Sequence, residues 1–259
     1  MLGEKVQIIF LLPLLNLPIY NTDNQVLNHM RTDFFYQKNI YDTEDEQDFN
    51  YINLGFTPNF RISSDLSLDI SFIAQHISID NDSYLNTAGT RLTLKKTISD
   101  SSRLNFGISH TKNFYEDDYD SKDGSNSGLG VSWTKGIQNF LITPFLGYSK
   151  ENADSDIYSF KRYSGGMGLF WLPFSKLSFS GFYRFQKSDY EDEEPLFLKR
   201  REDKVHFLSG DAKWMVYQNQ EKTISTYLGI SHLFINNNSN ADIYDYKKNK
   251  TTAYVKLSF

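Results

Sequence analysis

The last ten residues, Lys250–Phe259, read KTTAYVKLSF and decide the fold. Small or apolar side chains occupy every second position, and mostly polar side chains occupy the positions between them. The apolar set is Ala253, Val255, Leu257 and Phe259. A period of two is typical of a β-strand with one apolar and one polar face. The chain then ends on an aromatic residue.

A half-apolar strand that ends on an aromatic residue resembles the C-terminal signal of bacterial outer-membrane β-barrels. By this resemblance, Val255, Leu257 and Phe259 form the insertion signal, and the partners are the barrel-insertion machinery and the lipid of the outer membrane. The resemblance predicts an integral outer-membrane protein.

The composition of the 259 residues agrees with this prediction. Apolar residues make up only 39%, whereas aromatic residues reach 16%, with 17 Tyr and 21 Phe. A barrel with a polar interior and aromatic girdles at both membrane interfaces has this combination. The net charge of -5 does not favour a nucleic-acid partner. The absence of Cys excludes disulfides, thiol catalysis and cysteine zinc sites.

Beyond residue 25, alternating apolar runs of about ten residues are separated by connections that alternate between short and long. The short connections have tight-turn compositions and lie at 63–65, 99–102, 136–139, 173–176 and 218–222. The long ones are mostly polar and lie at 38–48, 80–84, 115–127, 151–157, 189–203 and 236–248. Five short turns and six longer loops in strict alternation predict twelve strands.

The strands favour a closed barrel over a soluble sheet with one wet face, which would have the same period. They are near the length that a tilted membrane strand needs, and closure removes exposed sheet edges. We therefore predict an all-β fold, a closed antiparallel up-and-down transmembrane β-barrel of about twelve strands, over residues 26–259. Short turns at one end and long loops at the other are typical of such barrels.

Residues 1–20 read MLGEKVQIIFLLPLLNLPIY. The apolar run from Val6 to Ile19 is too short for a membrane helix of about 20 residues, and it resembles the core of a secretory signal peptide. Glu4 offsets Lys5, and no small-x-small cleavage site follows. The alternatives are an export signal and the remnant of a longer N-terminal region.

Several charged residues fall on the polar side of their strands, where we expect them to line the lumen. They are Asp69, Arg91, Lys95, Arg184, Asp211, Lys213 and Lys256. A Lys or Arg facing lipid at the midplane would cost about 2–4 kcal/mol, so the lumen is the favoured place. Two interpretations stay open: the charges pair and brace the wall, or they select what passes.

No catalytic, cofactor or metal motif emerges, and we predict neither an enzyme nor a cofactor. Four histidines, His76, His110, His206 and His232, fall on the outward side near strand ends, where a polar tip suits the membrane interface. The acidic run from Asp117 to Asp123 does not match the calcium-loop spacing, so a solvated loop is the better interpretation.

Two stretches of the C-terminal third, DYEDEEPLFLKRREDK at 189–204 and NNNSNADIYDYKKNKTTAYVKLSF at 236–259, resemble the C-terminal barrel of the surface lipoprotein assembly modifier family. The residues that carry the resemblance are Pro195, Leu196, Phe197, Lys199, Arg200, Arg201, Glu202, Asp203, Ser239, Asn240, Tyr244, Asp245 and Tyr246.

This resemblance implies help in delivering lipoprotein clients to the cell surface. The family also has a periplasmic helical-repeat domain, which this sequence lacks, and usually fourteen strands, which is the alternative count. A small-solute, porin-like channel is the alternative function, and an adhesion barrel with acidic loops is a third.

Overall fold

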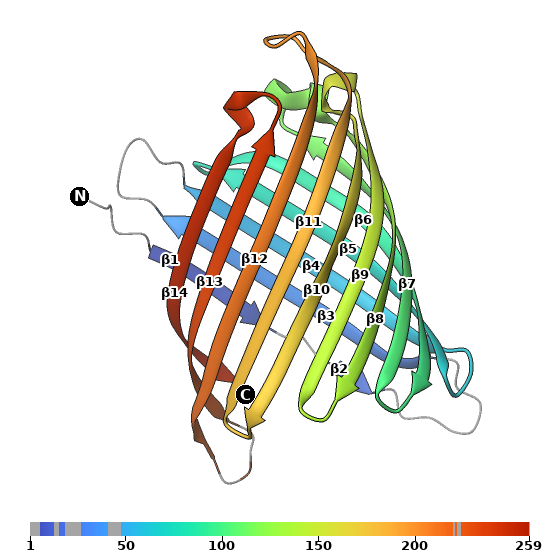
Figure 1. Cartoon of the computed structure of the whole chain (residues 1–259), viewed down its shortest axis with the longest axis vertical. Helices are drawn as coiled ribbons and strands as arrows, with labels where there is room; N and C mark the ends of the chain where they lie inside the picture. The colour runs from blue at the N-terminus through green and yellow to red at the C-terminus, as the bar shows by residue number, and fades with distance from the viewer. Residues whose placement is uncertain are drawn as a thin grey trace. The chain divides into compact units, whose positions relative to one another are not determined.

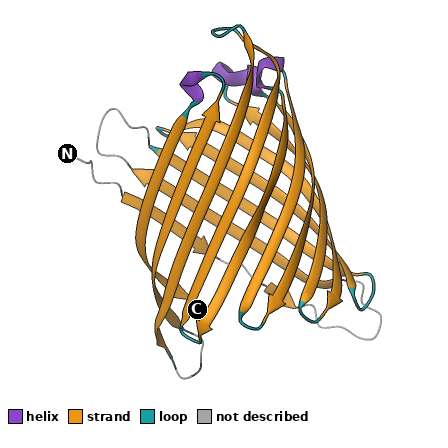
Figure 2. Ribbon diagram, viewed as in Figure 1, coloured by secondary structure: helices purple, strands orange, loops and turns teal. Residues whose placement is uncertain are grey.

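The computed structural model describes residues 6–12, 16–18, 27–40, 48–219, 221 and 224–258. Strands account for nearly all of this chain, as Figure 2 shows. The predicted all-β fold with twelve antiparallel up-and-down strands is confirmed by β3–β14 (Figure 1). Their bounds are β3 (Leu27–Ile40), β4 (Phe49–Arg61), β5 (Leu66–Ile79), β6 (Asp82–Ser99), β7 (Ser102–Tyr115), β8 (Gly124–Ile137), β9 (Phe140–Ala153), β10 (Phe160–Phe174), β11 (Leu177–Glu194), β12 (Lys199–Gln218), β13 (Ser225–Ser239) and β14 (Tyr246–Ser258).

Two further strand segments lie along the other edge of β3. β1 (Val6–Leu12) pairs with the C-terminal half of β3, and β2 (Asn16–Pro18) pairs with its N-terminal half. The pairing shifts by one residue between them, since Leu12 lies opposite Phe34 whereas Asn16 lies opposite Arg31. The export role of residues 1–20 stays a prediction.

The chain divides into two compact units, and each is described by itself. Unit 1 comprises residues 1–96, 105–129 and 149–160, and unit 2 comprises residues 97–104, 130–148 and 161–259. The strand order from β3 to β14 follows the sequence without a crossover.

Among the described residues, three short 3₁₀ segments occur in the connections: η1 (Asp117–Lys122), η2 (Asp156–Tyr158) and η3 (Asp242–Tyr244). In the part of the chain that the structure describes, no helix is long and apolar enough to cross a membrane.

Several connections are tighter than the sequence predicts. The predicted long loop at 80–84 is wrong, because β5 and β6 are joined by Asp80 and Asn81 alone. Both residues have positive φ, 52° and 70°, which a two-residue hairpin turn requires and which Asp and Asn tolerate. The predicted loop at 189–203 is also wrong, because β11 continues to Glu194 and β12 begins at Lys199. These strand ends carry polar residues on both faces, and alternation cannot detect such a strand.

The apolar side of the strands is the exposed side. Ile230 is 53% exposed and Val255 66%, and most large apolar residues of the other strands are exposed as well. Pro58 and Ala241 are the only nonpolar residues among those that the described structure buries; the rest are polar, such as Asn59 and Asp69. A water-soluble sheet would bury its apolar face instead.

Candidate functional site

The candidate site is the polar face of β11–β14, which lies within unit 2. Antiparallel register places partners on the same face. One row across the strands joins Ser178, Lys213, Gly229 and Tyr254. The next row, nearer the β10–β11 turn, joins Met215, Tyr227 and Lys256. The predicted inward residues Lys213 and Lys256 therefore share a face.

Tyr254 crosses the strand next to it to reach a carboxylate. Its hydroxyl donates a hydrogen bond to Asp211 on β12, although β13 lies between the two strands. The ring passes directly over Gly229, where a Cβ atom would lie 2.2 Å from the Tyr254 Cζ atom. Only glycine leaves room for this ring, so Gly229 and Tyr254 form a matched pair.

Asp211 also has a cationic neighbour on its own strand. The Lys213 ammonium lies 3.7 Å from Asp211 Oδ1, and both side chains are partly buried. Asp211 thus links the ring of β14 to the lysine of β12.

A cavity of about 300 Å³ lies at the β10–β11 turn end of this face. Three lysines line it, Lys176 from the turn, Lys213 from β12 and Lys256 from β14. Its apolar and aromatic walls come from Phe170, Leu172, Met215 and Tyr227.

A second cavity of about 320 Å³ lies further along the same strands. Small residues line much of it, including Ser180, Gly181, Ser209 and Gly210. Its lining residues Ser209 and Asp211 alternate with Gly210 along β12 and share the face of Lys213. Both cavities are therefore features of the polar face.

The other predicted inward charges lie as follows. In unit 1, Asp69 pairs with Lys95 and accepts a hydrogen bond from Asn59. Arg91 is exposed on the same face, opposite Ser71. In unit 2, the Arg184 guanidinium lies 5.2 Å from the centre of the Phe207 ring. Their role in lining a lumen stays a prediction.

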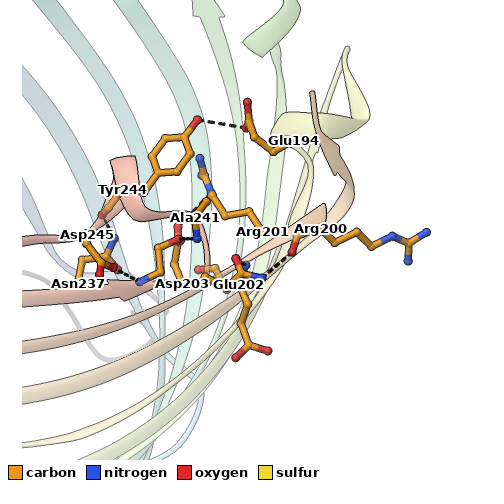
Figure 3. A network of polar contacts seen from close by, with 12 residues as sticks. Glu194, Arg200, Arg201, Glu202, Asp203, Asn237, Ala241, Tyr244 and Asp245 are labelled. Carbon is orange, nitrogen blue, oxygen red and sulfur yellow. Dashed lines mark hydrogen bonds and ion pairs between the residues drawn. The ribbon is translucent and has the colours of Figure 1, made fainter. Parts of the chain in front are cut away.

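A polar network joins the ends of β11, β12 and β13 to η3 (Figure 3). The Arg201 guanidinium carbon lies 3.6 Å from the ring centre of Tyr190 and 4.0 Å from that of Tyr244. Arg201 Nε lies 3.3 Å from Asp203 Oδ2, an ion-pair distance without hydrogen-bond alignment. The Tyr244 hydroxyl donates to Glu194 at 3.1 Å. Burial raises the pKa of the Tyr244 hydroxyl, and the negative charge of Glu194 raises it further.

Amide side chains hold the neighbouring connection in place. Asn240 donates to the Arg200 carbonyl at 2.8 Å and accepts from the Glu202 amide at 2.8 Å. Asn237 donates to the Tyr244 carbonyl at 2.7 Å, and Asp245 accepts from the Ser239 amide. Eight of the residues that carry the family resemblance thus meet here: Arg200, Arg201, Glu202, Asp203, Ser239, Asn240, Tyr244 and Asp245.

The remaining residues of that set are scattered. Pro195, Leu196 and Phe197 form the β11–β12 turn, and Lys199 begins β12. Tyr246 begins β14. Of the predicted insertion signal, Val255 lies on the exposed apolar face, Leu257 lies on β14, and Phe259 falls outside the described residues.

The acidic run in unit 1 encloses a lysine. The Lys122 ammonium lies 4.6 to 5.9 Å from the ring centres of Tyr84, Tyr115, Tyr119 and Tyr158. Asp123 accepts the amide of Tyr115 at 2.5 Å. Among the described residues, no group of three or more His, Cys, Asp or Glu side chains could hold a metal ion.

The four outward histidines each contact a polar group on the next strand. The hydrogen bonds join His76 to Asn86, His110 to Ser127, His206 to the Tyr183 hydroxyl and His232 to Thr251, at 2.8 to 3.0 Å.

Sequence reasoning missed Lys176, Tyr227 and Tyr254 as members of the site. Strand alternation places Tyr227 and Tyr254 on the polar face, so their parity could have found them. Lys176 lies in a turn, where alternation carries no information. Its place beside Lys213 depends on the folded hairpin.

Three solved structures resemble the chain. A double variant of OccD1 (OprD) is 13% identical with a TM-score of 0.46, over 98% of this chain and 85% of that one. OccK2 (OpdF) of Pseudomonas aeruginosa in complex with glucuronate is 7% identical with a TM-score of 0.24, over 89% and 92%. A BenF-like porin from Pseudomonas fluorescens Pf-5 is 8% identical with a TM-score of 0.26, over 98% and 97%. At these TM-scores the likenesses carry no argument.

No curated protein matches the sequence. Residues 81–258, more than half of the chain, match the family described as "Protein of unknown function (DUF2860)". The chain belongs to that family.

Proposed function

We propose that this chain is a closed β-barrel of the bacterial outer membrane that lets small polar solutes pass along its polar face. The observation that carries the proposal is the inverted distribution of side chains. Apolar residues such as Ile230 and Leu208 are about half exposed, whereas several polar residues of the opposite face, such as Asp69 and Asp211, are partly or fully buried. In water, an apolar surface of this extent would mark an interaction site or cause aggregation. In the hydrocarbon core of a membrane, the same surface is well solvated.

The height of the apolar band fits a membrane. On β10, Tyr163 and Trp171 lie on the exposed side, with Met167 and Leu169 between them. Eight residue steps span about 26 Å along the strand, or about 20 Å along the membrane normal at a tilt of about 40°, close to the band of about 25 Å known for such barrels.

Aromatic contacts occur at both levels of this band. Near the short-turn end, Trp171 stacks on Phe140 and Phe179, with ring centres 5.3 and 5.4 Å apart. At the other level Tyr148 meets Tyr163 at 5.2 Å. Two aromatic levels support girdles at two membrane interfaces.

The polar face suits water and solutes. It holds paired charges, Asp69 with Lys95 and Asp211 with Lys213, together with open cavities in unit 2. Charge pairs of both signs are easily accommodated beside water but costly in lipid.

Bilayer conductance tests the proposal. The full chain, purified from outer membranes in detergent, should give steady channel currents in planar bilayers, and vesicles containing it should swell in small neutral sugars. Chain that has been heat-unfolded before reconstitution is the control. A detergent-free soluble monomer, or a folded membrane protein that passes neither ions nor sugars, would refute it.

Delivery of lipoproteins to the cell surface remains a second proposal, supported by the family resemblance alone. It predicts that loss of the gene lowers the surface exposure of lipoprotein clients. Unchanged exposure in the deleted strain would count against it, whatever the conductance.

A further inference from the structure

We infer that the cavity lined by Lys176, Lys213 and Lys256 binds small organic anions that carry a carboxylate on an apolar body. The inference rests on the proposed function, because it assigns a solute class to the polar face of the barrel. Its first support is that three lysines, from the β10–β11 turn, β12 and β14, line one cavity of about 300 Å³.

Strand register explains the convergence. Lys256 lies opposite Tyr227, which lies opposite Met215. Met215 in turn donates its amide to the Lys176 carbonyl at 2.7 Å. Lys213 lies two residues before Met215 on the same side of β12. Lys176 and Lys213 are 37 residues apart in sequence and Lys213 and Lys256 are 43 apart, so only the folded sheet assembles the three.

The cavity carries a surplus of positive charge. Of the residues that the structure describes, no acidic one lines it. Lys213 has a neighbour in Asp211 at 3.7 Å, and Tyr254 donates a hydrogen bond to that same carboxylate. Among the described residues, Lys176 and Lys256 have no ion-pair partner.

The same protein neutralises a comparable lysine elsewhere. On the polar face of unit 1, Lys95 pairs with Asp69. Like charges repel each other, so a cluster in which only Lys213 has a carboxylate neighbour favours an anionic ligand. If the three lysines had only a structural role, we would expect each to have a carboxylate partner, as Lys95 has in Asp69.

The walls define the rest of the ligand. Phe170, Leu172 and Met215 present apolar surface, and Tyr227 presents a ring beside Lys256. A volume of about 300 Å³ is at the small end of ligand cavities, which favours a small molecule. An inorganic anion would leave the apolar walls uncovered, whereas an aromatic or branched carboxylate would cover them.

Binding of 4-fluorobenzoate to the full-length protein in detergent, followed by ¹⁹F NMR, tests the inference. The variant Lys176→Gln/Lys213→Gln/Lys256→Gln should raise the Kd about tenfold or more, because it removes the charge-assisted contacts. The matched control Lys199→Gln/Lys247→Gln/Lys248→Gln changes the net charge equally at exposed positions away from the cavity and should leave the Kd within about twofold of the original.

The neutral isostere 4-fluorobenzamide separates charge from apolar contact. It should bind weakly and equally to all three proteins. Equal 4-fluorobenzoate affinity in the original and the cavity variant, or an equal loss in the control variant, would overturn the inference. If the cavity variant does not fold, two other measurements test the inference: the Kd of the single variant Lys176→Gln and the salt dependence of the Kd of the original protein. An affinity that does not change with salt contradicts a lysine site.

Conductance measured on the same preparations keeps the two proposals apart. A channel that conducts but does not distinguish the benzoate from the benzamide refutes the anion site and leaves the pore intact. A protein that binds the benzoate through the three lysines but never conducts refutes the pore and leaves the site.

Discussion

Replacing Ile230 with lysine tests which solvent surrounds the apolar face. Ile230 lies in the middle of β13, between Ala212 of β12 and Ala253 of β14, and is 53% exposed. Its small neighbours cannot shield a longer side chain, so the lysine ammonium must enter whatever medium lies beside the strand.

The two possible media predict very different energies. In water, an exposed substitution of this kind changes the free energy of unfolding by about 0.5 kcal/mol or less. Near the bilayer midplane, a lysine costs about 2–4 kcal/mol. That cost corresponds to a change of about 30-fold to 700-fold in the folding equilibrium.

Reversible guanidinium titration of the protein folded into lipid vesicles, followed by tryptophan fluorescence, measures the change. The control is Ser231→Lys, at the next residue on the opposite face, where Asp211 lies across the strand pair. We expect the control to cost less than 1 kcal/mol, because its ammonium reaches water and a carboxylate. A cost below 0.5 kcal/mol for Ile230→Lys, or a larger cost for the control, would refute the orientation of the faces.

Three further predictions concern single interactions. Gly229→Ala should destabilise the protein by about 1–3 kcal/mol, since its Cβ meets the Tyr254 ring at 2.2 Å; chemical denaturation measures it, and Tyr254→Ala in the same background should recover part of the loss. Arg201→Lys should speed proteolysis of the neighbouring connections several-fold, because an ammonium cannot stack between two tyrosine rings as a guanidinium does. Glu202 lies beyond the apolar band, and its hydrogen bonds with Lys204 and a second lysine lower its pKa to about 2; the stabilisation is present above the ordinary pKa of 4.5 and is lost as the pH falls through 2. Carboxyl ¹³C NMR should show the shift, and Lys204→Met should raise the pKa.

The alternation of apolar and polar residues predicted the strands and their faces, because the medium beside each face constrains the residue type at every position. Ile230 and Leu208 must meet one medium and Asp211 another, so the sequence carries the pattern at each position. The same reasoning failed from Asp189 to Asp203. There polar residues occupy both faces, the alternation disappears, and strands that extend to Glu194 and from Lys199 have the composition of a loop.

The sequence could not predict which side chains contact each other across strands, and the reason is a different one. Alternation assigned Asp211 and Lys256 to the polar face, but contact depends on register. The bond from Tyr254 to Asp211 requires β14 and β12 to be aligned across β13 and requires glycine at one position between them. A shift of two residues would preserve every face and break this contact.

The length of β12 separates the two polar clusters of unit 2. Lys213 lines the lysine cavity, and Arg201 holds the network at the other end of the same strand. The twelve residue steps between them correspond to about 40 Å, well beyond the Debye length of about 8–10 Å at physiological salt. Charge changes at one cluster should therefore be screened from the other.

This separation makes the two clusters independently testable. Arg201→Lys should loosen the outer network and leave the Kd for 4-fluorobenzoate within about twofold, and combining it with Lys213→Gln should give additive changes in free energy. A double-mutant cycle on stability and benzoate affinity measures this. A coupling energy above about 0.5 kcal/mol would mean that the strand between the clusters moves as a unit, so that solute bound at one end changes the loops at the other.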